Sequence, residues 1–335
     1  MEKDNKTDKT AESFDVSWEL DSVIMQGTFV KPAGPGPFPA VAMVAGSGPT
    51  DRDWNSPLLP GTNGSARPLA EALAQAGIAS LRYDKRASGP HVRQNVQSLV
   101  GKMTMQSFAD ELAGAVRVLA SRAGVRKDRI FGLGNSEGTL HVLNYQLRSP
   151  EIPFAGIVLA APPGRAVGAV ARTQLAEQAS RLPNGDASMA LYDEAIARWM
   201  AGKPAAPDPS LPQGVQQLLQ SLEVPANLPF ARELWTANVA PLLSRVDVPV
   251  LVVIGKKDIQ VDWQIDGEPI ERAVAGRDNV VFRFPENANH VLKHEPAPRA
   301  ELVTADVLGR YSAPDARLDP EAVKDILGWL AERTS

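Results

Sequence analysis

The sequence predicts an α/β fold, in which a mostly parallel sheet of eight strands carries helices on both faces and a helical segment is inserted. Short apolar runs, typical of buried parallel strands, alternate with helical patterns along most of the chain. The alternation stops after Pro163 and resumes near Val246, with only helical segments and proline-rich joints between. The chain has 335 residues, 44% of them apolar, which is enough for one large domain with an insertion.

The expected strands fall into two groups. Alternating polarity at residues 14–20 and 22–31 indicates an antiparallel pair at a sheet edge. Six buried strands follow, at residues 39–45, 78–83, 129–134, 156–161, 249–255 and 279–284. The main helices are expected at residues 65–76, 105–122, 137–148 and 320–333, and those of the insertion at residues 168–182, 187–201, 213–221 and 229–237.

These elements divide the chain into a catalytic domain and a cap. The catalytic domain is expected at residues 14–163 and 246–335, and the helical cap insertion at residues 164–245. Residues 1–13 are polar and are expected to form a disordered tail. The cap or the edge strands at residues 14–31 could each support a homodimer.

Composition excludes several classes of protein. With 35 Lys and Arg against 39 Asp and Glu, the formal net charge is −4, which does not favour binding to nucleic acid or an anionic membrane. The chain has no cysteine, so disulfides, zinc thiolates and a cysteine nucleophile are excluded. No apolar run approaches the ~18 residues of a transmembrane helix, and the polar N-terminus lacks a signal peptide. We therefore expect a cytoplasmic location, although secretion with a removed signal stays open.

The elbow segment Gly134-Asn135-Ser136-Glu137-Gly138 predicts a serine nucleophile. An apolar strand ends at Gly134 and a helix begins after Ser136, so the serine lies on a tight strand-to-helix turn. Such a turn strains the serine backbone and requires small neighbours two residues away on either side. The hydroxyl then stands clear of the sheet, near the positive end of the helix.

A serine needs a base to be nucleophilic at neutral pH, and the chain has 4 histidines. His290 lies in the loop after the last expected strand and is the preferred base, with His294 as the second choice. His141 lies on the helix after the elbow, five residues beyond Ser136, so its side chain is expected to point away from the serine. His91 follows a Gly-Pro pair in an early loop, where a surface or packing role is expected.

The acid that orients the imidazole is expected at Asp258. This residue directly follows the strand at residues 249–255, on the edge where parallel sheets build their sites. Asp262 and Asp266 are nearby alternatives.

Acyl transfer also needs hydrogen-bond donors for the developing oxyanion. The N–H of Glu137, which follows the nucleophile, is one candidate. The second is expected in the glycine-rich loop at residues 45–49, where the N–H of Ser47 is preferred and Gly48 comes next.

Together these residues resemble the α/β-hydrolase superfamily, in particular bacterial esterases and serine aminopeptidase-like hydrolases with a helical cap. The resemblance rests on the motifs at residues 45–53 and 81–86, and on the elbow followed in order by Asp258 and His290. It extends from about residue 16 to the end of the chain, apart from the cap.

The chain departs from the family pattern in two places, neither of which removes a catalytic atom. Ala87 stands where related proteins usually have glycine, and Ala45 stands where they often carry histidine. The resemblance implies an α/β-hydrolase fold and hydrolysis of carboxylic esters through a covalent acyl-enzyme. No cofactor is expected, and no cluster of His, Asp or Glu has the spacing of a metal site.

The substrate is expected to be a small-molecule ester with a short or medium acyl group. Substrate contacts are predicted from Gly48 and from the cap residues Trp199, Phe230 and Trp235, although most apolar cap residues should form the cap's own core. An aminopeptidase or amidase is an alternative that would need a cap carboxylate to hold the substrate amine, and four are available: Glu177, Asp193, Glu194 and Glu233. A thioesterase is also an alternative, and a non-catalytic binding protein is a remote one.

Five charged residues in the two early motifs remain without a role in this chemistry: Arg52, Asp53, Asp84, Lys85 and Arg86. They could contact the substrate, but ion pairs near the bases of the loops are the favoured prediction.

Overall fold

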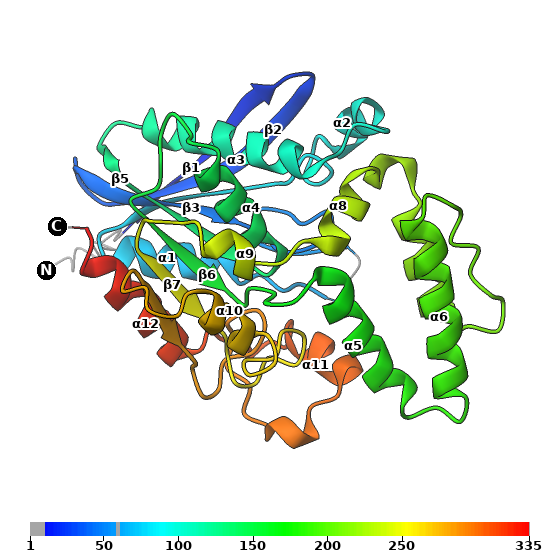
Figure 1. The fold of residues 1–335 in the computed structure, drawn as a ribbon. Helices are drawn as coiled ribbons and strands as arrows, with labels where there is room; N and C mark the ends of the chain where they lie inside the picture. Colours follow the sequence, from blue (N-terminus) through cyan, green and yellow to red (C-terminus); the bar gives the residue numbers. More distant parts are fainter. Residues whose placement is uncertain (1–10, 58–60, 335) are drawn as a thin grey trace, which may run out of the picture.

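A single twisted sheet of eight strands organises the chain, as the computed structural model shows (Figure 1). The structure describes residues 11–57 and 61–334. The strand order is β1-β2-β4-β3-β5-β6-β7-β8. The strands are β1 (Ala11–Leu20), β2 (Val23–Pro32), β3 (Phe38–Val44), β4 (Ala79–Tyr83), β5 (Val125–Asn135), β6 (Gly156–Ala160), β7 (Val250–Val253) and β8 (Val280–Arg283).

The predicted pairing of the strands is confirmed. β1 pairs antiparallel with β2 at the sheet edge, β2 pairs antiparallel with β4, and every later pair is parallel. β1 begins at Ala11, which lies opposite Pro32, so residues 11–13 belong to the sheet and not to a tail. The rest of the predicted tail, residues 1–10, lies outside the described residues.

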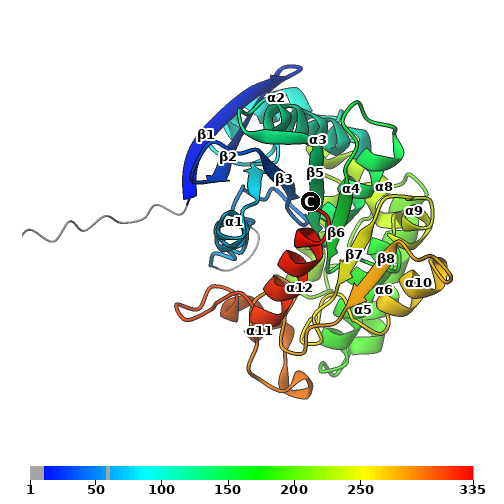
Figure 2. The same cartoon turned by 90° about the vertical axis from the view of Figure 1, so that its left-hand side faces the viewer.

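The strands β3, β6 and β7 are apolar on both faces because helices cover both faces of the sheet (Figure 2). The helices outside the cap are α1 (Ala66–Gln75), α2 (Val92–Leu99), α3 (Met105–Ala120), α4 (Glu137–Leu147), α9 (Ala240–Leu243), α10 (Gly267–Ala273), α11 (Thr304–Arg310) and α12 (Pro320–Ala331). In β3, Ala42 and Val44 face the core under α3, α4, α9 and α10, while Val41 and Met43 face the core under α1 and α12.

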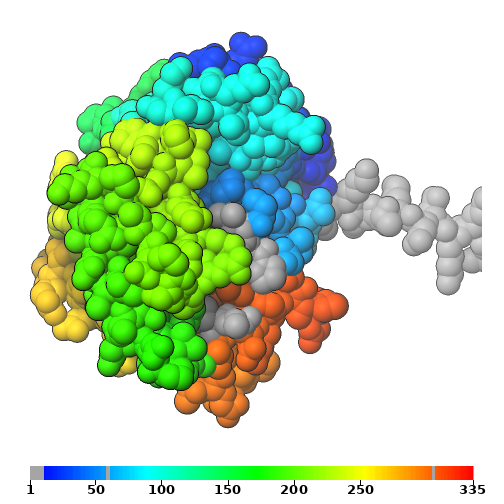
Figure 3. Space-filling model, turned by 90° about the vertical axis from the view of Figure 1, so that its right-hand side faces the viewer, coloured from blue at the N-terminus to red at the C-terminus, as the bar shows by residue number. Residues whose placement is uncertain are grey.

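The cap forms a separate apolar core beside the sheet. Its helices are α5 (Val167–Ala179), α6 (Gly185–Met200), α7 (Gln213–Leu222) and α8 (Phe230–Thr236). Tyr192, Trp199 and Leu219 are among its buried residues. The short helix α9 lies within the range predicted for the cap, but its Leu243 packs into the main core. Figure 3 shows the cap, in green, on the face where the blue loops after β3 and the orange C-terminal segment also meet.

The two-sided core gives a direct stability prediction. Leu112 of α3 is fully buried in the main core, so Leu112→Ala should lower the free energy of unfolding by roughly 2–5 kcal/mol. Leu182 is 48% exposed, so Leu182→Ala is the matched control and should change it by less than about 0.5 kcal/mol. Urea titrations of both variants measure the difference, and equal losses would contradict the placement of Leu112.

Candidate active site

Ser136 lies on the turn between β5 and α4, with φ 54° and ψ −121°. The close packing of this turn leaves no room for side chains on the two flanking glycines. A Cβ on Gly134 would lie 2.4 Å from the carbonyl oxygen of Gly138, and a Cβ on Gly138 would lie 2.5 Å from that of Val44. The glycines therefore allow the end of β3, the serine turn and the start of α4 to touch.

His290 and Asp258 lie together at the carboxyl edge of the sheet. The Nδ1 atom of His290 is 2.8 Å from Oδ2 of Asp258, whose side chain is completely buried. The other carboxylate oxygen, Oδ1, accepts the N–H groups of Gln260 and Val261 at 2.8 and 2.9 Å. With both oxygens engaged, the carboxylate holds the ring in one orientation, and Nε2 is left to exchange a proton with a hydroxyl.

The loop that carries His290 is pinned to its surroundings by three side chains that the sequence did not single out. The Nδ2 group of Asn135 donates to the carbonyl of His290 at 3.1 Å. Oδ1 of Asn289 accepts the N–H groups of Val291 and Lys293. The ammonium of Lys293 donates to the carbonyls of residues 63 and 311. Asn135 lies inside the elbow motif and Asn289 bonds within its own loop, whereas Lys293 carries no local signal because its partners are distant in sequence.

Ser136 and His290 line one cavity of about 240 Å³. Its other lining residues come from the loop after β3, the elbow and the C-terminal loops: Gly46, Ser47, Gly48, Thr50, Trp54, Ser56, Asn63, Asn135, Gln260, Val291 and Tyr311. In the described part of the chain, this lining includes neither a carboxylate nor a cap residue.

The predicted substrate contacts are therefore placed in different regions. Gly48 lines the cavity. Trp199 and Trp235 pack edge to face within the cap, with ring centroids 5.6 Å apart. Phe230 packs against Phe108 of α3, with ring centroids 4.4 Å apart. Helical periodicity could not distinguish these packing roles from a role in the cavity, because both favour an apolar residue.

Trp54 and Tyr311 line the cavity but were not predicted. Trp54 follows directly on the motif at residues 45–53, so its position in the sequence was a usable signal. Tyr311 comes from the C-terminal loops and accepts a hydrogen bond from Nε2 of Gln260 at 2.8 Å. Burial and the nearby charge of Asp258 raise the pKa of its hydroxyl, which therefore stays protonated at neutral pH.

The alternative acids and bases are engaged elsewhere. Asp262 pairs with Arg299, and Asp266 is buried and pairs with Arg165 at 2.9 Å. Nδ1 of His294 is 3.1 Å from Oδ2 of Asp319.

His141 is fully buried in α4, with Nε2 3.0 Å from Oε1 of Glu137. Burial lowers its pKa, so the ring is neutral at pH 7. By itself burial would raise the pKa of Glu137, but the charge of Lys85 and the hydrogen bond with His141 outweigh it and lower that pKa to about 2. Glu137 is therefore a buried carboxylate at neutral pH.

The charged residues of the early motifs pair as the sequence predicted. Arg52 contacts Asp84 at 2.6 Å, Asp53 contacts Arg82 at 2.8 Å, and Lys85 contacts Glu137 at 2.8 Å. Arg86 contacts the fully buried Glu111 of α3 at 2.5 Å.

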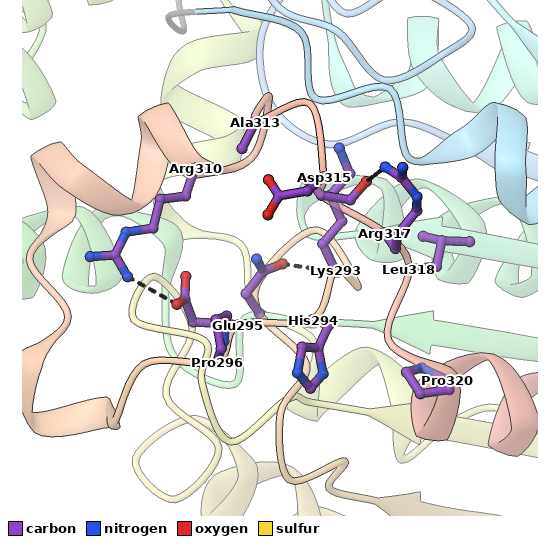
Figure 4. A pocket seen from close by; sticks show the side chains of 12 residues that line it. Lys293, His294, Glu295, Pro296, Arg310, Ala313, Asp315, Arg317, Leu318 and Pro320 are labelled. Carbon is purple, nitrogen blue, oxygen red and sulfur yellow. Dashed lines mark hydrogen bonds and ion pairs between the residues drawn. The ribbon is translucent and has the colours of Figure 1, made fainter.

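A larger cavity of about 590 Å³ lies beside the His290 loop and does not include Ser136 (Figure 4). Several of its ionic side chains bind one another or the backbone. Arg310 contacts Glu295 at 2.9 Å, and the ammonium of Lys293 binds two carbonyl oxygens, as described above. These contacts explain the charged lining without a ligand, so we place the candidate site at Ser136.

Residues 11–57 and 61–334 contain no group of three or more His, Cys, Asp or Glu that could hold a metal ion. They also contain no helix that is long and apolar enough to cross a membrane.

The sheet order and the serine turn after β5 define the class of α/β proteins that present a serine at the carboxyl edge of a parallel sheet. Within that class, the chain belongs to the alpha/beta hydrolase family, whose model matches residues 41–305.

A curated relative, esterase EstD of Thermotoga maritima, is 29% identical over 268 residues. The match covers 80% of this chain but only 58% of the relative's length.

Solved structures share the fold at low sequence identity. A proline iminopeptidase of Mycobacterium smegmatis matches with a TM-score of 0.55 and 15% identity, over 96% of this chain and 98% of that one. The esterase Pf2001 of Pyrococcus furiosus matches with a TM-score of 0.54 and 18% identity, over 96% and 91%. A 2,6-dihydroxy-pseudo-oxynicotine hydrolase matches with a TM-score of 0.55 and 15% identity, over 96% and 68%.

The packing of the elbow predicts that one methyl group added at Gly138 destabilises the fold. Gly138→Ala places a Cβ against the carbonyl oxygens of Val44 and Ala45, so the free energy of unfolding should fall by roughly 1–3 kcal/mol. Gly214 of α7 has open space at the same position, so Gly214→Ala should be neutral or slightly stabilising. Thermal unfolding compares the two variants, and an unchanged Gly138→Ala protein would show that the elbow is not tightly packed.

Proposed function

We propose that this protein hydrolyses carboxylic esters, with Ser136 as nucleophile, His290 as general base and Asp258 as the residue that orients the base. One observation carries the proposal: the 2.8 Å contact between His290 and a fully buried Asp258, in the loop that lines the same cavity as the elbow serine. The esterase relative supports the choice of an ester as the substrate.

In the first half of the reaction, Nε2 of His290 removes the proton of the Ser136 hydroxyl as the oxygen attacks the ester carbonyl. The imidazolium that forms is stabilised by the carboxylate of Asp258. It then protonates the departing alcohol, which leaves an acyl group on the serine. In the second half, His290 removes a proton from water, the resulting hydroxide attacks the acyl carbon, and the proton returns to Ser136 as the acid is released.

The oxyanion of each tetrahedral intermediate is bound by the N–H groups of Ser47 and Glu137 in this proposal. Glu137 is the first residue of α4, where the N–H has no acceptor within the helix. The loop before Ser47 lies against the nucleophile, because a Cβ on Gly46 would lie 3.3 Å from Cβ of Ser136. Both donors are therefore expected beside the reacting oxygen.

The environment of the cap carboxylates favours an ester over an aminopeptidase substrate. Glu177 pairs with Arg181, Asp193 with Arg172, and Glu194 with Arg198. Glu233 accepts the N–H of Met105 at 2.5 Å. None of the four is among the described residues that line the cavity, so none is placed to bind a substrate amine.

Ser136→Ala should reduce hydrolysis of p-nitrophenyl butyrate by at least about 10³-fold, because the nucleophile is lost. The matched control is Ser98→Ala, since Ser98 lies on the helix α2 and bonds only to a backbone carbonyl nearby. Retained activity in Ser136→Ala would refute the nucleophile assignment. Faster turnover of amino-acid naphthylamides than of esters by the unaltered protein would instead favour the peptidase alternative.

The size of the cavity predicts a preference for short acyl groups. Its volume of about 240 Å³ is below the ~300–1,000 Å³ of sites that hold drug-sized ligands. We expect kcat/KM to be highest for p-nitrophenyl acetate or butyrate and to fall at least about tenfold for the decanoate. An ester series of increasing chain length measures this, and a maximum at the decanoate would contradict it.

A further inference from the structure

One buried ammonium group has no part in the proton transfers proposed above. Lys85 follows β4 and is only 3% exposed. Its Nζ atom donates to the carbonyl oxygen of Gly46 at 2.5 Å and lies 2.8 Å from Oε1 of Glu137. Lys85 therefore joins the loop after β3 to the start of α4, the two segments that carry the proposed oxyanion donors.

The contact with Gly46 fixes the direction of a donor. The carbonyl of Gly46 and the N–H of Ser47 belong to the same peptide group, which is planar and trans, so the two bonds point in opposite directions. An ammonium group that holds the carbonyl on the buried side directs the N–H to the other side. The hydroxyl of Thr50 donates to the same carbonyl at 3.2 Å and reinforces this orientation.

The contact with Glu137 fixes the second donor. The Oε1 atom of Glu137 contacts both the ammonium of Lys85 and Nε2 of His141, at 2.8 and 3.0 Å. The His141 ring stacks on Phe108, with centroids 4.5 Å apart and planes 11° apart. A side chain restrained by two such contacts restrains its own backbone, and the Glu137 N–H belongs to that backbone.

We propose that Lys85 is a positioning residue that holds the N–H groups of Ser47 and Glu137 in place for the oxyanion. This inference rests on the proposed ester hydrolysis and adds a residue that touches neither the substrate nor the reacting atoms. Because the charges of Lys85 and Glu137 oppose each other at short range, their effect is to fix geometry more than to supply a net field at the serine.

The experiment compares Lys85→Met with Arg86→Met. Arg86 is the next residue and forms an equally buried ion pair with Glu111, but its pair lies on α3 and not at an oxyanion donor. For Lys85→Met we expect kcat on p-nitrophenyl butyrate to fall about 10–100-fold, with KM within about threefold. Misplaced oxyanion donors stabilise the transition state less, but they leave substrate binding unchanged. For Arg86→Met, kcat per folded molecule should stay within about threefold of the unaltered protein.

A double variant separates positioning from stability. Lys85→Met leaves the carboxylate of Glu137 buried without its cation, which destabilises the fold. Adding Glu137→Gln removes that charge while the backbone N–H remains. The melting temperature should then recover, while kcat should stay low because the Gly46 carbonyl keeps only the longer hydrogen bond from Thr50. Recovery of kcat together with the melting temperature would overturn the proposal and leave Lys85 a purely structural residue.

An inhibitor that mimics the tetrahedral intermediate gives an independent measurement. The affinity of a trifluoromethyl ketone should fall in Lys85→Met by about the same factor as kcat/KM, since both depend on the oxyanion donors. An unchanged affinity would overturn the proposal. If the unaltered protein hydrolyses no ester, the proposed function itself fails, and that outcome is distinct from a Lys85→Met variant that retains full activity.

Discussion

The close contact between β3, the serine turn and the start of α4 is the constraint on which the site depends. Gly134 and Gly138 allow backbone atoms to approach where any side chain would clash. This contact places the loop after β3 directly beside Ser136, so that the end of one strand carries the proposed nucleophile and its neighbour carries a proposed oxyanion donor. The parallel order of the strands then places Asp258, which follows β7, at the same edge of the sheet.

Buried charged residues also lie at this edge of the sheet. Two pairs, Lys85 with Glu137 and Arg86 with Glu111, lie side by side beneath the elbow, and all four side chains are at most 8% exposed. Moving two charges out of water costs free energy that their attraction largely returns, so such pairs contribute little net stability. Their benefit is to fix the geometry of the segments that they join, and for Lys85 and Glu137 those segments carry the proposed oxyanion donors.

The cap has less direct influence on the cavity than its composition suggested. Its large aromatic residues pack in its own core or against α3 and α4, and the described lining of the cavity comes from loops of the main domain. A small cavity whose lining includes polar groups such as Tyr311 and Gln260 is better matched to a short acyl group than to a long chain. The cap's contribution to substrate choice is therefore expected to be indirect, through the loops that it covers.

The sequence by itself determined the features that depend on neighbouring residues. Buried parallel strands need continuous apolar runs, and the serine turn needs glycines at fixed offsets, so the sheet, its edge pair and the elbow could all be predicted from local patterns. The chain order of Ser136, Asp258 and His290 was equally visible, although the 2.8 Å contact between the last two was not.

Only the tertiary structure decided which distant residues meet. Lys85 could be recognised as part of an ion pair, but its contact with Gly46 depends on how β3 and β4 lie in the sheet. The pinning of the His290 loop by Lys293 and the place of Tyr311 in the cavity depend on contacts between segments far apart in the chain. Apolar cap residues were ambiguous for a related reason: a helical pattern shows that a face is buried, and only the packing shows what covers it.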